Sequence, residues 1–377
     1  MFVLRHEGSL LEASGIARSL RFRGTGSVER QVRAFFAAQD AGVQGLLVGV
    51  LPFDLDGEVI LSQPEQVYHG GPAWPVREAP PEAVKPRRIT EVPTAAAYAA
   101  MVRDALALIA AAPQDGLRKV VLSRSLRMEM DAPVDPLLIA QRLSIDPSIT
   151  VFLASLGGEG EGKAIVGATP ELLLSRRGLA IASHPLAGSA ARSADPAEDR
   201  AAADALLRSD KDRREHKLLA EAVLDTLAPY CASLSAPDGI ALRATATVWH
   251  LGTRIEGVLK SVDAPSAAGL AALLHPTPAV GGHPRTEALA AIRALEPHER
   301  GYYAGAVGWV DGRGDGEWYV SLRCAEIAGE EVVLQAGAGI VAGSDPDAEV
   351  AETAAKFRAM LAALGLDNGG HFLEEAA

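Results

Sequence analysis

The sequence contains few cysteines and no excess of positive charge, and each shortage excludes a class of protein. Its two cysteines, Cys231 and Cys324, are too few for a disulfide framework or a cysteine-based metal site. Acidic residues number 48 against 36 basic ones, a formal net charge of -12, so neither nucleic acid nor an anionic membrane is expected as the main partner. An anionic small substrate would need local help from Arg, Lys or a metal ion.

Long apolar runs are also missing. Charged residues interrupt the Ala/Leu stretches well short of the about 20 residues that a membrane-spanning helix needs. Residues 1–15 show no basic segment followed by a long apolar run, so no signal peptide is expected. These absences predict a cytoplasmic protein that does not bind membranes.

The order of the predicted elements favours an α+β fold. A chain of 377 residues can form one large domain or two ordinary ones. Residues 63–93 are rich in proline and are expected to form a loop or crossover. Beyond them, strand–turn–strand units outnumber strand–helix–strand units, which indicates large antiparallel sheets flanked by helices. We therefore expect a single domain over 1–377, with 94–365 as its catalytic core and 1–93 as an N-terminal part of the same fold.

Individual elements follow from periodicity and turn chemistry. The motif DGRGDG (311–316) lies between two β-rich runs and predicts a hairpin. Ser344 is the candidate N-cap of the last helix, with Pro346 in its first turn. The other predicted elements are helices at 94–112, near 135–144, at 209–228 and within 277–295, and strands at 118–130, on both sides of a glycine-rich turn at 157–162, and at 331–343.

Two glycine-rich motifs imitate nucleotide-binding loops. GGEGEGKA (157–164) nearly matches a phosphate-binding loop, but Ala164 stands where a Ser or Thr should reach a magnesium ion, so a polar hairpin turn is favoured. GAGIVA (337–342) fits the loose dinucleotide pattern, but the expected helix begins only after Ser344, and too few residues follow for a second βα unit. Its glycines can still let backbone N–H groups approach a ligand closely.

Two predicted helices carry acids three residues apart, on one helical face. These are Asp212 and Glu215 in the helix at 209–228, and Glu349 and Glu352 in the last helix. On the first helix alone, a capped and solvated helix start is the better interpretation. Together, the helices could instead hold a cation between them. Carboxylates without cysteine or an obvious histidine pair favour Mg²⁺ over Zn²⁺.

Isolated charged residues lie in the β-rich runs. Lys119 is expected to share a strand face with Val121, and Arg323 one with Ser321. Such residues usually face solvent, but a Lys buried beside a cation loses affinity for its proton and can act as a base. Glu171 is followed by three leucines and could be desolvated and kept protonated as an acid, or could face solvent at a strand start.

Seven sequence blocks occur in a fixed order along the chain. They are KVVLSR (119–124), GATPELLL (167–174), HPLAGSAAR (184–192), KDRREH (211–216), HPTPAVGG (275–282), GAVGWVDGRGDGEWYVSLRCAEI (305–327) and AGAGIVAGSDPDAEVAET (336–353). Together they resemble the chorismate-utilising enzymes, and most of all isochorismate synthases of the siderophore type. The resemblance spans about 118–360 and covers the N-terminal third only loosely.

The resemblance implies a fold and a reaction. The family's fold is one large α+β unit, with two antiparallel sheets flanked by helices and the site between the sheets. In the implied isomerase reaction a water oxygen adds to C2 of chorismate while the C4 hydroxyl leaves. Lys119 would be the general base that activates water, and Glu171 the general acid that protonates the departing hydroxyl.

The resemblance also implies a cofactor and a binding pocket. Glu215 and Glu352 would be Mg²⁺ ligands, and Asp212 and Glu349 would hold metal-bound waters. The metal would bind the ring carboxylate of chorismate. The positions similar to substrate-binding residues of the family are Arg323 and Tyr303 for the enolpyruvyl carboxylate, Lys356 close by, the site-lining His250, and the amides around Gly188, Ser189, Gly337 and Gly339.

Several alternatives stay open. Family members that use ammonia usually show PIAGTR where this chain has PLAGSAAR, so a glutamine amidotransferase subunit is not expected. A salicylate synthase, which adds pyruvate elimination, remains the main alternative, and a menaquinone-pathway enzyme is another. A non-catalytic chorismate-binding protein would be expected to lose Lys119 or Glu171. The resemblance favours a monomer.

Overall fold

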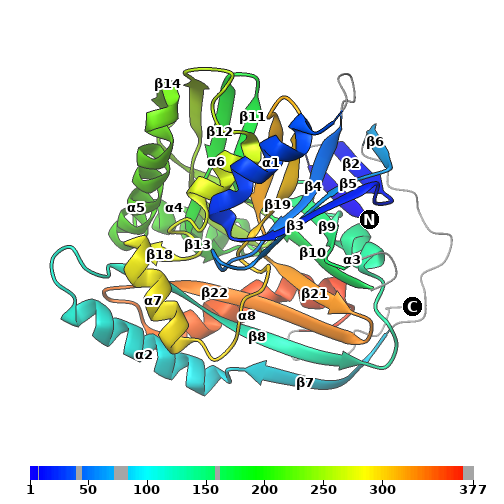
Figure 1. The fold of residues 1–377 in the computed structure, drawn as a ribbon. Helices are drawn as coiled ribbons and strands as arrows, with labels where there is room; N and C mark the ends of the chain where they lie inside the picture. Colours follow the sequence, from blue (N-terminus) through cyan, green and yellow to red (C-terminus); the bar gives the residue numbers. More distant parts are fainter. Residues whose placement is uncertain (7, 40–44, 72–83, 158–161, 368–377) are drawn as a thin grey trace.

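Antiparallel sheets build most of the protein. The computed structural model describes residues 1–6, 8–39, 45–71, 84–157 and 162–367. Two large sheets lie one above the other in Figure 1, with helices on their outer sides. All strand pairings among these residues are antiparallel. The expected α+β class, one large domain of antiparallel sheets flanked by helices, is confirmed.

One large sheet has ten strands in the described part of the chain; its strands at residues 119–130 and 331–341 lie at the bottom of Figure 1, and those at residues 9–14 and 66–70 lie at the upper right. The two long strands near one edge run side by side, with Lys119 opposite Val341 and Val121 opposite Gly339. In spatial order the strands are β18 (Gly282–His283), β8 (Lys119–Met130), β22 (Glu331–Val341), β21 (Cys324–Ala328), β10 (Lys163–Thr169), β9 (Thr150–Ser155), β1 (Phe2–His6), β2 (Ser9–Ser14) and β6 (Gln66–Gly70), and β7 (Pro86–Val92) pairs with the outer side of β8.

The second large sheet has nine described strands, and a third, small sheet has three. The nine are β14 (Cys231–Ser235), β17 (Ile255–Leu259), β12 (Ala180–His184), β11 (Leu172–Arg177), β20 (Gly316–Val320), β19 (Ala306–Asp311), β4 (Leu46–Leu51), β5 (Glu58–Gln63) and β3 (Arg18–Arg23). The small sheet contains β13 (Leu186–Ala191), β16 (Val248–Thr253) and β15 (Ile240–Ala244). Strands from residues 1–70 therefore belong to both large sheets.

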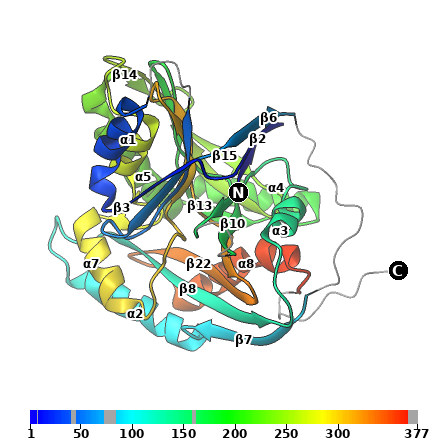
Figure 2. The same cartoon turned by 45° about the vertical axis from the view of Figure 1, so that its right-hand side comes forward.

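Helices cover the sheets on several sides (Figures 1 and 2). Against the ten-stranded sheet pack α2 (Ala95–Ala111), α3 (Pro136–Leu143), α7 (Arg285–Leu295) and α8 (Pro346–Ala363). The nine-stranded sheet is covered by α6 (Ala267–Leu274), which in turn packs on α1 (Val28–Ala37). The small sheet contacts α4 (Pro196–Arg208) and α5 (Asp210–Leu227).

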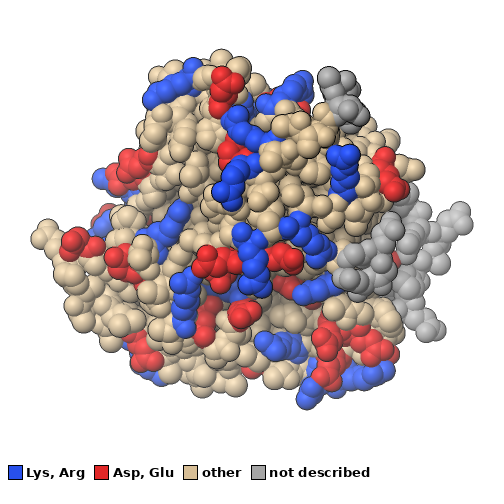
Figure 3. Space-filling view, viewed as in Figure 1, with Lys and Arg blue, Asp and Glu red and all other residues tan. Residues whose placement is uncertain are grey.

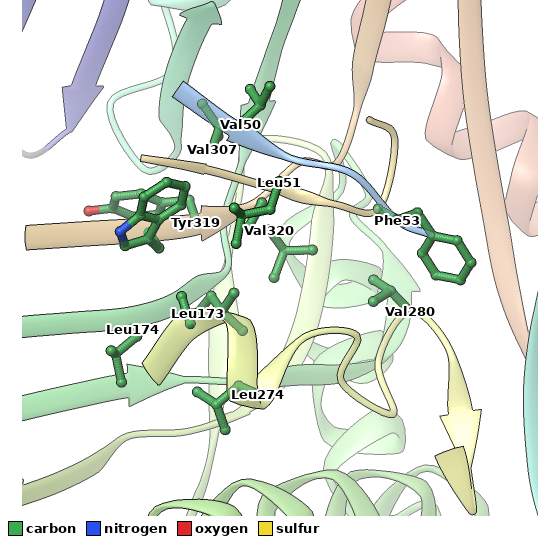
Figure 4. Close-up of a cluster of buried hydrophobic side chains, with 14 of the residues drawn as sticks. Val50, Leu51, Phe53, Leu173, Leu174, Leu274, Val280, Val307, Tyr319 and Val320 are labelled. Atoms are coloured by element: carbon green, nitrogen blue, oxygen red, sulfur yellow. The ribbon is translucent and has the colours of Figure 1, made fainter. Parts of the chain in front are cut away.

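Apolar side chains fill the space between α6 and the nine-stranded sheet. Leu173 on β11, Val320 on β20 and Leu274 on α6 are each at most 2% exposed and belong to one buried cluster. Figure 4 shows these side chains beside Leu51 in the interior. Burying a side chain of this size contributes roughly 1.5–3 kcal/mol relative to leaving it exposed. This packing holds β11 and β20, the strands that lead into the site described below.

Most predicted elements are present, and two predictions are wrong. The proline-rich segment is not all loop, because it contributes β6 and β7, while residues 72–83 lie outside the described chain. The N-cap of the last helix is Asp345 rather than Ser344, because the Asp345 carboxylate accepts from the backbone N–H groups of Asp347 and Ala348. The capped start considered for the helix at 209–228 is present, because Ser209 accepts from the Asp212 N–H.

The two nucleotide-like motifs have no nucleotide-loop geometry in the described chain. Gly337 and Gly339 lie inside β22 rather than at the start of a helix. Residues 158–161 of the other motif lie outside the described chain, but the strands on its two sides, β9 and β10, pair antiparallel as a hairpin requires.

The described helices include none with both the length and the apolar composition required to cross a membrane. On the face seen in Figure 3, acidic and basic side chains are interspersed rather than gathered into one basic patch.

Candidate active site

Two corners of the chain, where it passes from one large sheet to the other, define the site. The first joins β10 to β11 and carries Glu171; the second joins β20 to β21 and carries Arg323. Arg323 has a φ of 44°, in the left-handed region that residues with a side chain seldom adopt. The expectation that Arg323 continues a strand face from Ser321 is therefore wrong, because the chain turns between sheets there.

A pocket lies between these corners. Most of the residues expected in the site line it, from three strands, two helices, the corner segments and the turn that carries Tyr303. Its lining includes Glu171, Gly188, Ser189, Glu215, His250, Tyr303, Arg323, Gly337, Gly339, Glu352 and Lys356. Lys119, Asp212 and Glu349 are not part of the lining.

Lys119 lies directly behind the pocket wall. Its Nζ is 2.8 Å from Glu215 Oε1, and the side chains of Lys119 and Glu215 are 1% and 11% exposed. Gly339 on the neighbouring strand gives the pair room, since a Cβ at this position would come within 2.7 Å of Glu215 Oε1 and 3.0 Å of Lys119 Cε. Lys119 therefore meets the pocket wall at Glu215 and Gly339.

Glu171 is buried with its proton retained at neutral pH. It is 2% exposed, and burial raises the pKa of its carboxyl group to about 8, although Lys119, Lys356 and a backbone hydrogen bond from Leu186 oppose the shift. The desolvated acid expected from the sequence is thus present. Because an acid must carry a proton to donate one, this environment suits Glu171 to general-acid chemistry.

Arg323 is oriented by a neutral histidine. Its Nη2 donates to His250 Nε2 at 2.9 Å. Burial, together with the charges of Arg323 and Lys356, lowers the pKa of His250 well below its usual range, while a backbone hydrogen bond with Gly188 opposes this. The neutral ring accepts through Nε2 and leaves the rest of the guanidinium fork available for a carboxylate.

Tyr303 and Lys356 both converge on Gly337. Burial raises the pKa of Tyr303, which also forms a hydrogen bond with the Gly337 backbone. A Cβ on Gly337 would approach the Tyr303 hydroxyl to 3.1 Å. Lys356 Nζ donates to Gly337 O at 2.8 Å and to Glu352 Oε1 at 2.6 Å. A phenol and an ammonium group therefore reach the same wall of the pocket.

The four acids on α5 and α8 divide into two pairs. Glu215 and Glu352 face the pocket, and Ser189 Oγ donates to Glu352 Oε1 at 3.3 Å. Burial raises the pKa of Glu352, but Lys356 and other neighbours outweigh it and hold the pKa below the usual range.

The other two acids lie outside the pocket lining. Glu349 is 3% exposed; its carboxylate lies 3.5 Å from Lys211, and burial followed by the charge of Glu352 raises its pKa. Asp212 packs against Gly188, where an added Cβ would lie 3.0 Å from the Asp212 Cβ.

The donor set fits a magnesium ion that is held only partly by protein. Within the described ranges, no group of three His, Cys, Asp or Glu side chains converges. Mg²⁺, however, is commonly bound by one or two carboxylates, with water and substrate oxygens completing its shell. Glu215 and Glu352 supply two such carboxylates to one pocket, so these residues fit a Mg²⁺ completed by substrate rather than an all-protein cage.

Several lining residues were not predicted from the sequence, Leu186 and Gln335 among them. Leu186 supplies the backbone hydrogen bond to Glu171. Gln335 donates from Nε2 to Arg300 O at 3.0 Å, while its buried Oε1 accepts no hydrogen bond from the described residues. Neither belongs to a charged motif, so only the position of Gln335 beside the glycine-rich block could have indicated it.

Comparison with known proteins places this site in a family. Residues 73–365 match the family model described as chorismate binding enzyme. The chain therefore belongs to the chorismate-binding enzymes, as the sequence blocks indicated.

Within this family, several proteins similar to this chain are named as isochorismate synthases. Isochorismate synthase DhbC of Bacillus subtilis (strain 168) is 44% identical over 338 residues, which cover 88% of this chain and 84% of the relative. The crystal structure of DhbC from Bacillus anthracis superposes with a TM-score of 0.88 at 37% identity, covering 97% of this chain and 95% of that one. MenF, the menaquinone-specific isochorismate synthase from Escherichia coli, superposes with a TM-score of 0.83 at 25% identity, covering 96% and 88%.

Proposed function

We propose that this protein is an isochorismate synthase, an isomerase that converts chorismate reversibly into isochorismate with Mg²⁺. The observation that carries the proposal is the placement of a buried lysine and a buried protonated glutamic acid at one pocket that also holds Arg323 and Lys356. Relatives named as isochorismate synthases, aligned over most of the chain, support the same activity.

The chemistry needs one proton removed and one proton supplied. Lys119 takes a proton from the water that attacks C2, and Glu171 donates one to the hydroxyl that leaves C4, so water is consumed and released in equal amounts. Each such positioned proton transfer is typically worth about 10²–10⁴-fold in rate. The burial of both side chains keeps bulk water from competing for these protons.

Protein side chains and a metal ion would together offset the negative charge of the substrate. Chorismate is a dianion, whereas the protein carries a formal net charge of -12, so attraction must come from local cations. Arg323, held by His250, and Tyr303 bind the enolpyruvyl carboxylate, with Lys356 close by. Glu215 and Glu352 would hold a Mg²⁺ ion, which would supply positive charge for the ring carboxylate, and Asp212 and Glu349 would hold metal-bound waters.

We further propose that the enzyme acts in the cytoplasm as a monomer without an amidotransferase subunit. Its product would serve siderophore synthesis through 2,3-dihydroxybenzoate or salicylate. The similarity to DhbC supports this pathway, and the similarity to MenF keeps the menaquinone pathway as the alternative.

Incubation with chorismate and Mg²⁺ tests the activity. Isochorismate should form without pyruvate, measured by chromatography and by a lactate dehydrogenase assay, and isochorismate given as substrate should return chorismate. Substantial pyruvate with salicylate would instead identify a salicylate synthase. Chorismate binding without turnover would identify a non-catalytic binding protein.

A further inference from the structure

A second buried ion pair lies beside the pocket and takes no part in the proton transfers. Glu296 follows the last residue of α7, and Arg300 lies four residues further on. Both side chains are only 2% exposed, and Arg300 Nε donates to Glu296 Oε2 at 2.9 Å. Burying two charges carries a desolvation cost that only good geometry and further hydrogen bonds offset. A pair at this depth therefore calls for a structural or functional reason.

The remaining donors of Arg300 hold two segments of the pocket wall. Its Nη1 donates to Val280 O at 2.8 Å and its Nη2 to Val121 O at 2.7 Å. Both valines line the pocket. They come from different elements, since Val121 lies on β8 and Val280 in the loop that follows α6. One guanidinium thus fixes the separation of these two wall segments.

The backbone carbonyl of Arg300 and the carboxylate of Glu296 make further hydrogen bonds beside the pocket. Arg300 O accepts from the Tyr303 N–H at 3.0 Å and from Gln335 Nε2 at 3.0 Å, and both of these residues line the pocket. Glu296 Oε1 accepts from the N–H of Ser123 at 2.7 Å and from its hydroxyl at 3.0 Å. Because Ser123 lies two residues beyond Val121, the backbone of β8 is held at two successive points along one edge of the strand.

We propose that the Glu296–Arg300 pair positions the substrate-binding wall of the pocket. This inference rests on the proposed isochorismate synthase activity and adds to it the group that sets the shape of the chorismate site. The pair touches neither the substrate nor the reacting atoms, so both are positioning residues. Lys119 and Glu171 are held by separate contacts, to Glu215 and to the Leu186 backbone. Losing the pair should therefore weaken substrate binding more than it slows the chemical step.

The geometry of Arg300 provides the test. Arg300→Lys keeps the charge but replaces the planar fork, which donates from three nitrogens to four oxygens, by a single nitrogen that cannot reach all four positions. We expect the KM for chorismate to rise by about tenfold or more, because small displacements of positioning groups are costly. We expect kcat to stay within about threefold, as for the loss of interactions shared by ground and transition states.

Two milder variants keep the test informative if the Arg300→Lys protein does not fold. Glu296→Gln preserves the shape of the acid but removes its charge, and Ser123→Ala removes only one hydrogen bond to it. The rise in KM should decrease in the order Arg300→Lys, Glu296→Gln, Ser123→Ala. Binding of chorismate measured by calorimetry should weaken in the same order.

Arg176 supplies a matched control for stability. It is also 2% exposed, and its guanidinium donates to four backbone carbonyls, those of residues 178, 262, 264 and 265, none of which lines the pocket. Arg176→Lys should lower Tm about as much as Arg300→Lys while leaving KM unchanged.

The outcomes separate this inference from the proposed function. Failure of the unsubstituted protein to bind chorismate would overturn both. Normal turnover by that protein, with unchanged KM in the three pocket variants or with kcat alone reduced, would overturn only the positioning role. An equal rise in KM for Arg176→Lys would also overturn it, because the effect would then follow stability alone.

Discussion

Two lysine–glutamate ion pairs border the same pocket, and they differ in depth. Lys119–Glu215 joins β8 to α5 with side chains 1% and 11% exposed, whereas Lys356–Glu352 lies within α8 with side chains 25% and 35% exposed. Shielding from water strengthens electrostatic interactions and restricts proton exchange, while partly exposed pairs are screened. The same two residue types are therefore suited to different work: proton transfer at the inner pair, and charge neutralisation of substrate at the outer pair.

Exchanging each lysine for arginine should separate these roles most strongly. Arginine keeps the positive charge but does not release its proton, so it cannot act as a base. We expect Lys119→Arg to reduce kcat by about 10²–10⁴-fold, as Lys119→Ala should, without loss of chorismate binding. Lys356→Arg should stay within about fivefold of normal kcat/KM. Equal losses in the two arginine variants, measured by steady-state kinetics, would contradict the division of roles.

Glu171 differs from the glutamates of both ion pairs, because no lysine lies at hydrogen-bonding distance from it among its described contacts. Its pKa is raised to about 8 by burial, so the proton needed for catalysis is present at neutral pH and is lost as pH rises through that value. We expect kcat to fall above about pH 8 and not to change with the titration of Glu171 at lower pH.

Glu171→Gln provides the control for that pH profile. It should lower kcat by about 10²–10⁴-fold and remove the alkaline fall. An alkaline fall of the same midpoint in Glu171→Gln would show that another group titrates.

Glu215 and Glu352, the glutamates of the two ion pairs, should both bind Mg²⁺ although their side chains differ in exposure. If both hold Mg²⁺, Glu215→Gln and Glu352→Gln should each raise the Mg²⁺ concentration for half-maximal activity by about tenfold or more, since even outer-shell partners of metals have effects of that size. Glu221→Gln on the same helix α5 is the control, because Glu221 is 55% exposed. Metal binding measured by calorimetry on the chorismate complex should show the same shifts. An unchanged Mg²⁺ requirement in either pocket variant would remove that residue from the metal site.

Residues that repeat along one element could be located from the sequence. The i, i+3 acids of α5 and α8 and the DGRGDG hairpin both depend on periodicity or turn chemistry within a short segment. The structure agrees with each. Helical spacing alone did not show which acid of each pair faces the pocket, and the ordered sequence blocks supplied that choice for Glu215 and Glu352.

Features that depend on the meeting of distant segments could not be predicted. Arg323 was assigned to a continuous strand, but its positive φ arises where the chain passes between sheets, and no residue at that position marks the turn. The same holds for Leu186, whose backbone N–H reaches Glu171, and for Arg300, whose carbonyl partners lie 20 and 179 residues away in the chain. β6 and β7 likewise form by pairing with β2 and β8, which are distant in the chain, although prolines surround them.

The origin of the new hydroxyl oxygen tests the central claim most directly. If Lys119 activates water for attack at C2 while Glu171 expels the C4 hydroxyl, isochorismate formed in ¹⁸O-labelled water should carry one labelled oxygen at C2, seen by mass spectrometry at early reaction times. Isochorismate without the label, with its C2 hydroxyl transferred from C4 of the same molecule, would contradict the roles of both residues.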